Sequence, residues 1–229
     1  MAALRIHDPQ HPERPVVAAG APWFMTLFGR DSLISAWMML PFSHELAHGT
    51  LAALAESQGT QFDPLTEEEP GRILHEVRSG LYSQVTLAGA STYYGTADAT
   101  PLFVMLVGEL SRWGAEDSEI ADLMPHVDRA LEWITGPGDP DQDGFVEYQR
   151  HTPQGLANQG WKDSWDGINF ADGRIVSTPI ALCEVQAYCY GAFEARADLA
   201  ERLDDPATAR RWRDRAEELR VRFDEQFWL

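Results

Sequence analysis

The chain has 229 residues, of which 44% are apolar and 10% aromatic, a composition typical of a folded globular protein and not of a disordered tail. Its formal net charge of −18 leaves no basic surface for a nucleic acid or an anionic membrane, so we expect a small or neutral partner. No apolar run approaches the roughly 20 residues of a membrane span, and the N-terminus has no apolar signal core, which favours a cytoplasmic location.

The sequence pattern predicts an all-α fold built from three pairs of helices. Residues 1–20 are rich in proline, so we expect a non-helical lead-in segment there and one helical domain over residues 21–229. Asp31, Thr100 and Thr178 are the predicted caps of the first helix of each pair. Apolar periodicity and these caps predict helices over residues 32–40, 45–57, 100–113, 118–134, 178–203 and 205–227.

Two long connections, residues 58–100 and 136–170, separate the three pairs, and loops of this length usually carry function. The first connection is expected to contain a short helical turn at residues 73–77 and has room for a small β-hairpin. Layered helical hairpins of this kind close into a ring with about six pairs. Three pairs leave an exposed apolar seam, which the other half of such a ring or a partner must cover.

Two carboxylates lie beside tryptophans in the second long connection. Asp163 and Asp166 are three residues apart and are flanked by Trp161 and Trp165. Cleavage of a glycosidic bond needs a carboxylic acid that stays protonated near neutral pH, and a neighbouring carboxylate and apolar walls both raise the pKa of an aspartate. The alternative is a helix start capped by aspartate, with tryptophan filling the core.

Other polar residues precede the first helix of a pair. Arg30 and Asp31 offer a fork of donors and a pair of acceptors, which together can hold neighbouring hydroxyls of a sugar. The alternative is that Asp31 is a helix cap beside a solvated arginine. Glu69, Tyr94 and Asp98 lie in polar loops that also read as ordinary connections. Because all these positions precede the same kind of helix, we expect them at one rim of the fold.

An acidic turn resembles the start of a calcium loop. The spacing of Asp139, Asp141, Asp143 and Gly144 fits such a loop, but the twelfth position is Arg150, where a bidentate glutamate is required. This argues against an EF-hand. The interpretation is an Asp/Gly turn that leads into a strand-like segment, with a single structural calcium ion as the alternative.

The sequence excludes several chemistries. It contains no phosphate-binding loop, no Gly-x-Ser-x-Gly elbow, no zinc-type spacing of Cys and His, and no dinucleotide fingerprint. The two cysteines, Cys183 and Cys189, fall on different faces of one predicted helix, so we expect both to be reduced, buried thiols. Nucleotide chemistry and serine hydrolysis are therefore disfavoured.

Five segments together carry a resemblance to a known family. They are PWFMTLFGRDSLI, EEPGRILHEVR, YYGTADATPLF, DQDGFVEY and NQGWKDSWDGI, in this order between Ala21 and Phe227. In combination they resemble the catalytic domain of bacterial amylo-α-1,6-glucosidases, the glycogen-debranching proteins related to glycoside hydrolase family 63 and, more distantly, to glucoamylases and trehalases. The resemblance implies the six-hairpin (α/α)6 toroid of these glycosidases, with this chain as its N-terminal half.

The resemblance also implies an inverting hydrolase of α-glucosidic linkages in an oligo- or polysaccharide, with no catalytic metal. Asp163 matches the family's general acid, and Asp166 is the competing assignment. Arg30 and Asp31 match positions that hold the sugar at the cleavage subsite. The residues expected to line the site beside them are Phe28, Glu69, Tyr94, Asp98, Trp161 and Lys162.

The chain departs from the family in ways that leave alternatives open. Relatives take the general base from a later barrel segment and commonly have an N-terminal β domain, so we expect this chain to hold only the acid half of the site. One alternative is a non-catalytic carbohydrate-binding fragment. Another is a hydrolase of a small glycoside such as mannosylglycerate or glucosylglycerate. A helical-repeat scaffold is disfavoured because solenoid repeats are short and regular.

Overall fold

The computed structural model describes residues 4–8, 10–78 and 89–228, and this part of the chain is mostly helical. The result confirms the predicted all-α class. Within these ranges, no helix is long and apolar enough to cross a membrane. The helices are α1 (Arg30–Met39), α2 (His44–Glu56), α4 (Ala99–Arg112), α5 (Asp117–Ile134), α6 (Cys183–Arg202) and α7 (Pro206–Gln226).

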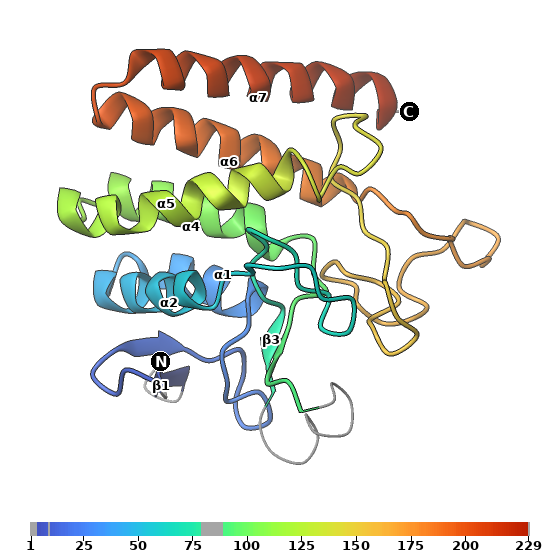
Figure 1. The fold of residues 1–229 in the computed structure, drawn as a ribbon, viewed down its shortest axis with the longest axis horizontal. Helices are drawn as coiled ribbons and strands as arrows, with labels where there is room; N and C mark the ends of the chain where they lie inside the picture. Colours follow the sequence, from blue (N-terminus) through green and yellow to red (C-terminus); the bar gives the residue numbers. More distant parts are fainter. Residues whose placement is uncertain (1–3, 9, 79–88, 229) are drawn as a thin grey trace.

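The helices form three stacked hairpins. Helices α1 and α2, α4 and α5, and α6 and α7 pack as pairs, and α4 lies between α1 and α6 (Figure 1). Figure 1 also shows that the long connections gather at one end of the stack, on the right in that view. Because α1, α4 and α6 all begin at this end, the residues that precede them share one rim.

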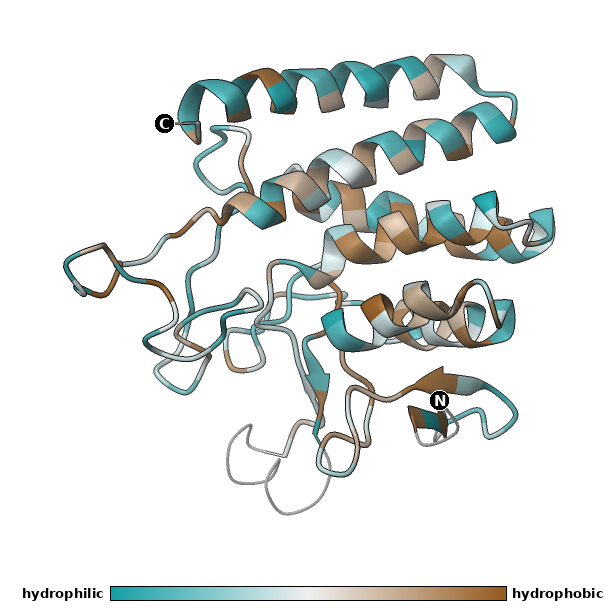
Figure 2. Cartoon of the chain, turned by 180° about the vertical axis from the view of Figure 1, so that it is seen from behind, coloured by the Kyte–Doolittle hydropathy of each residue, from teal (hydrophilic) through white to brown (hydrophobic). Residues whose placement is uncertain are grey.

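Apolar faces hold the stack together. In α5, Leu123, Val127 and Leu131 recur every four residues and are buried, while the opposite face is polar. Helices α4 and α6 approach each other closely at Gly108, which faces Ala195. A Cβ on Gly108 would lie 2.7 Å from the Ala195 methyl group. Figure 2 shows this division: apolar residues line the inner helices, and α7 is largely hydrophilic.

The described part of the N-terminal segment contains two short strands. Strands β1 (Arg5–His7) and β2 (Pro15–Val17) pair antiparallel. The pair lies on α2, where the backbone N–H of Val17 donates to the Thr50 hydroxyl at 3.1 Å. The segment is therefore packed on the helical domain and is part of the same folded unit.

Three predicted helix starts are wrong. Helix α1 begins at Arg30 with Gly29 at the cap position, so Asp31 lies inside the helix. Helix α4 begins at Ala99, and the Thr100 hydroxyl accepts from the backbone N–H of Ile73 instead of capping its own helix. Thr178 lies five residues before the first residue of α6. There the backbone is extended, because Ile180 forms a β-bridge with Tyr148.

Two further predictions are corrected in the same way. The expected helical turn at residues 73–77 is extended backbone. The backbone N–H of His75 donates to the Tyr93 carbonyl, and β3 (Glu76–Val77) pairs with β4 (Thr92–Tyr93). The expected small β-structure in this connection is thus present as a two-residue ladder, and residues 79–88 lie outside the described residues. Cys183 is exposed, contrary to expectation, whereas Cys189 is buried.

One face of α1 and the turn that follows it is apolar and exposed. Ile34, Met38 and Phe42 recur every four residues, and Met38 and Phe42 are 72% and 81% exposed. Within the part of the chain that the structure describes, this row is left open to solvent.

Candidate active site

Arg30 is the centre of a cluster of carboxylates at the rim. Its Nη1 donates to Oδ2 of Asp98 at 2.9 Å, its Nη2 lies 3.6 Å from Oδ2 of Asp163, and its Nε lies 3.9 Å from Oδ2 of Asp31. The structure therefore brings together four predicted site residues from three separate segments of the chain.

Close backbone packing places Arg30 at this position. A Cβ on Gly29 would lie 2.1 Å from the Leu74 carbonyl oxygen and 2.7 Å from the Ala99 Cβ, so only glycine lets the start of α1 approach the start of α4. The Gly29 N–H also donates to the His75 carbonyl at 2.9 Å. Asp98 is fixed in turn by the Thr96 hydroxyl, which donates to its Oδ1 at 2.6 Å.

The cluster opens on a hollow of about 370 Å³. Arg30 and Asp31 line it together with Trp161, and Lys162 lies over the Trp161 ring with its Nζ 5.5 Å from the centroid. Tyr188, which the sequence analysis missed, closes the side formed by α6. The remaining lining residues are Ala19, Ile34 and Ser35.

Burial and neighbouring charges shift the pKa values of three side chains that line the hollow, Asp31, Arg30 and Tyr188. Burial raises the pKa of Asp31, and the charges of Asp98 and Asp163 act in the same direction against the opposing charge of Arg30. Burial lowers the pKa of Arg30, but the carboxylates of Asp98, Asp31 and Asp163 together more than offset this effect, so its pKa is raised and the guanidinium remains charged. Burial, with the charge of Asp98, raises the pKa of Tyr188.

The other predicted lining residues lie away from this hollow. The Phe28 ring packs edge-on against Phe24 and His75. Glu69 accepts from Trp133 Nε1 at 2.6 Å and lines a different, smaller hollow. The Tyr94 hydroxyl is committed to the Ser57 carbonyl at 2.8 Å, and burial raises its pKa to about 12. Asp98 and Asp163 do not line the hollow themselves and approach it through Arg30. Asp166, the competing acid assignment, is exposed and does not line it either.

A buried polar network ties the rim loops together. Gln159 lies between Glu67 and Arg72, and it hydrogen bonds to both side chains at 2.7 Å. Glu67 has a φ of 58°, a left-handed conformation that is costly for a residue with a side chain. Sequence reasoning did not identify this network, because Glu67 and Gln159 are separated by 92 positions in the chain and no short motif connects them.

The acidic turn predicted as a possible calcium loop is compact. One carboxylate oxygen from each of Asp139, Asp141 and Asp143 lies within 4.8 Å of the others. Oδ1 of Asp139 is buried and has no hydrogen-bond partner, while its Oδ2 accepts from the Gly144 N–H at 3.0 Å. Burial and the charges of the three aspartates raise the pKa of Glu147 nearby.

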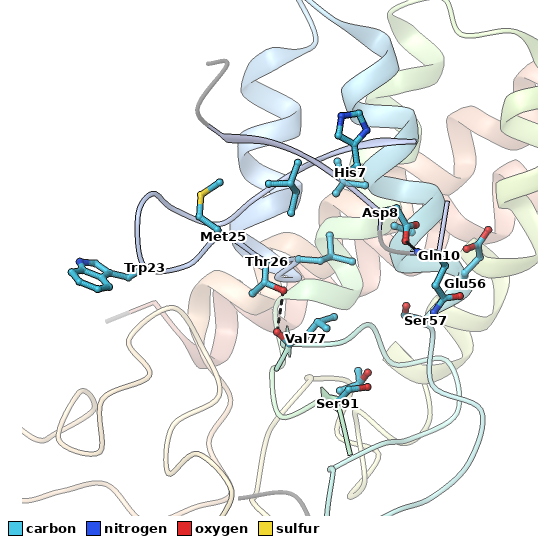
Figure 3. A pocket seen from close by; sticks show the side chains of 15 residues that line it. His7, Asp8, Gln10, Trp23, Met25, Thr26, Glu56, Ser57, Val77 and Ser91 are labelled. Atoms are coloured by element: carbon cyan, nitrogen blue, oxygen red, sulfur yellow. Dashed lines mark hydrogen bonds between the residues drawn. The ribbon is translucent and has the colours of Figure 1, made fainter. Parts of the chain in front are cut away.

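A larger hollow, of about 690 Å³, lies elsewhere, beside the N-terminal strands (Figure 3). Its walls include His7 and Asp8 from the N-terminal segment, Glu56 from the end of α2, and Val77, whose carbonyl accepts from the Thr26 hydroxyl at 3.1 Å. None of the predicted site residues lines it. We therefore place the candidate site at the smaller hollow, where the charged side chains converge.

Comparison with known proteins gives no family for this chain, so a functional assignment depends on the side chains described above. No protein-family model matches the chain, and no curated protein matches it.

Proposed function

We propose that this chain is a glycoside hydrolase of the amylo-α-1,6-glucosidase type, which cleaves α-glucosidic linkages with inversion. The observation that carries the proposal is the position of Arg30, which lines the hollow with Asp31 and the exposed Trp161 and pairs with Asp98 and Asp163. A neutral sugar needs this combination: donors and acceptors for its hydroxyls, and a flat apolar face for its ring.

The stacked hairpins support the finer fold assignment, an (α/α)6 toroid of which this chain forms the N-terminal half. The first helices of the three pairs begin at one end, which is where such a ring would bind its substrate. The exposed row of Ile34, Met38 and Phe42 fits the seam that further helical hairpins or another partner would cover.

Each side chain has a role in the proposed reaction. Arg30 and Asp31 hold hydroxyls of the sugar, and buried Asp98 keeps the guanidinium in place. Asp163 is the general acid: its half-exposed carboxylate lies 3.6 Å from Arg30, which lines the hollow, and it protonates the leaving oxygen. An inverting reaction also needs a carboxylate that activates water on the opposite side of the sugar, which a later barrel segment supplies in the family.

Calorimetric titration with isomaltose, an α-1,6-linked glucose disaccharide, tests the binding part of the proposal. Wild-type protein is expected to bind, and Arg30→Ala to lose binding by at least about tenfold, since charge-assisted hydrogen bonds are among the strongest. The matched control is Arg174→Ala, because Arg174 pairs with Asp172 on the exposed loop outside the hollow. No binding by the wild-type protein contradicts the proposal.

Release of glucose from a branched α-glucan tests the catalytic part. Release that is lost in Asp163→Asn, with isomaltose binding retained, supports Asp163 as the acid. Release that persists in this variant overturns that assignment. Binding without hydrolysis by this chain is also expected of the acid half alone. Binding without hydrolysis by a protein that carries the later barrel segment as well favours the second candidate, a non-catalytic carbohydrate-binding unit, for which the exposed face of Trp161 is the supporting observation. Tighter binding of glucosylglycerate or mannosylglycerate than of isomaltose favours a hydrolase of small glycosides.

We also propose a structural calcium ion at Asp139, Asp141 and Asp143. The buried, unpartnered Oδ1 of Asp139 supports it, because a buried carboxylate oxygen without a partner is costly. The glycine at the sixth position, Gly144, has a φ of 91°, as the sharp turn of a calcium loop requires. The ion would stabilise the turn and take no part in the chemistry.

A further inference from the structure

The amide of Gln159 is buried between two opposite charges, and they fix its orientation. Its Oε1 accepts from Nη2 of Arg72 at 2.7 Å, and its Nε2 donates to Oε2 of Glu67 at 2.7 Å. Glu67, Gln159 and Arg72 are 0%, 1% and 3% exposed. A flipped amide would face donor with donor and acceptor with acceptor, so only one orientation satisfies all three groups.

Glu67, Gln159 and Arg72 form a hydrogen-bonded chain, which we call the relay. Direct contacts lead from this relay to Asp98, the carboxylate that holds Arg30. The backbone carbonyl of Gln159 accepts from the backbone N–H of Ala97 at 2.7 Å, and Ala97 immediately precedes Asp98. Arg72 Nε donates to the Thr96 carbonyl at 3.1 Å, and the Thr96 hydroxyl donates to Asp98. The relay therefore fixes the backbone on which Asp98 is carried.

The same relay also holds the loop that carries Trp161 and Asp163. Oε1 of Glu67 accepts from the His151 N–H at 3.0 Å. Gly155 lies so close that a Cβ there would be 2.2 Å from this oxygen. Gln159 itself precedes Trp161 by two residues, so its side chain anchors the start of the segment that lines the hollow.

We propose that Glu67, Gln159 and Arg72 are positioning residues, which set the distance between Arg30, Asp98 and the segment of Trp161 and Asp163. The proposal rests on the proposed sugar site, since it names what holds that site together. It concerns geometry alone: none of the three side chains lines the hollow of Arg30.

A reciprocal exchange of the two side chains tests the relay. In Glu67→Gln, the new amide offers one acceptor to two donors, Gln159 Nε2 and the His151 N–H. In Gln159→Glu, two buried carboxylates meet. In the double variant Glu67→Gln/Gln159→Glu, the new Gln donates to the new Glu and still accepts from His151, while the new Glu still accepts from Arg72. The pairing of donors and acceptors is then complete again.

Isomaltose affinity and amide hydrogen exchange are the two readouts. Each single variant is expected to bind isomaltose about tenfold more weakly and to exchange the Ala97 and His151 amides at least about tenfold faster. The double variant is expected to return both values to within about threefold of wild type, which is strong non-additivity. Thr96→Val, which removes only the hydroxyl bond to Asp98, is expected to weaken binding while leaving the His151 amide protected.

The matched control is Gln58→Glu. Gln58 is also a buried amide, and it links Gly71 and His126 outside the hollow. This variant is expected to melt at a lower temperature and to bind isomaltose within about twofold of wild type, which separates a loss of stability from a loss of positioning. If it weakens binding as much as the relay variants do, the positioning role is overturned.

Two other results would overturn the positioning role. The first is a double variant whose Ala97 and His151 amides exchange as fast as in the single variants. The second is faster Ala97 exchange in the single variants with unchanged isomaltose affinity. Should wild-type protein fail to bind isomaltose, the sugar site is wrong, and amide exchange in the two single variants and the double variant still decides whether Glu67 and Gln159 act as one unit. If a single variant fails to fold, as shown by its circular dichroism, the double variant and Thr96→Val decide.

Discussion

His75 couples the stability of the rim to pH. Burial lowers its pKa to about 3, and the positive charges of Arg30, Arg78 and Arg72 add to the effect. The unfolded chain binds a proton on this histidine below about pH 6.5, whereas the folded protein does not until about pH 3. The neutral, buried His75 therefore costs the folded protein nothing above about pH 6.5, and the free energy of unfolding falls as the pH drops from about 6.5 towards 3. At pH 5, about 1.5 units below the unfolded value, the loss is about 2 kcal/mol.

His75→Phe removes this proton linkage and keeps an aromatic ring against Phe28 and Tyr93. Urea unfolding at pH 7 and pH 5 measures the effect: the drop in unfolding free energy between the two is expected to be about 2 kcal/mol smaller in the variant. The variant also removes the buried, unpartnered Nδ1, so its stability at pH 7 is expected to match or exceed that of wild type. The control is His44→Gln at an exposed position. An unchanged pH dependence in His75→Phe would refute the reasoning.

Three other predictions follow from the same contacts. Because burial raises the pKa of Asp31, its stabilising contribution is present below the unfolded pKa and is lost as the pH rises, so Asp31→Asn is expected to raise the melting temperature at pH 7 but not at pH 3. Gly29→Ala places a methyl group against the Leu74 carbonyl and is expected to cost about 1–3 kcal/mol in urea unfolding, whereas Gly20→Ala, with no atom closer than 3.9 Å, is expected to be nearly neutral. Calcium at millimolar concentration is expected to raise the melting temperature of wild type but not of Asp139→Asn, and an equal rise in both would contradict a calcium site at this turn.

The helices were the predictable part of the fold, and their starts were the least predictable part. Helix α5 has a strong apolar period and acidic residues at its start, so its sequence alone locates it. Thr100 and Thr178 both precede proline and read alike in sequence. In the folded protein one hydroxyl binds the Ile73 N–H, and the other threonine precedes a β-bridge at Ile180. Partners far away in the chain decide such starts, and a local pattern does not contain them.

The candidate site divides along the same line. Arg30, Asp31, Asp98 and Asp163 could be placed at one rim, because each lies in a polar segment near a helix start or in a long connection. Tyr188 could not, since it lies within α6 and no local motif distinguishes it. Glu69 and Tyr94 have the right residue types, but the Trp133 indole and the Ser57 carbonyl occupy their polar atoms.

The rim and the helical stack are held by different forces, which gives them different tolerance to denaturant. Apolar side chains such as Leu106 and Val127 hold the stack, whereas polar bonds between loops hold the rim through Gln159. Loop segments joined by a few such bonds detach at a lower free-energy cost than the packed helices between them. Dilute urea is therefore expected to abolish ligand capture while the far-ultraviolet helical signal persists, so inactivation would be an early and reversible event that precedes melting of the scaffold.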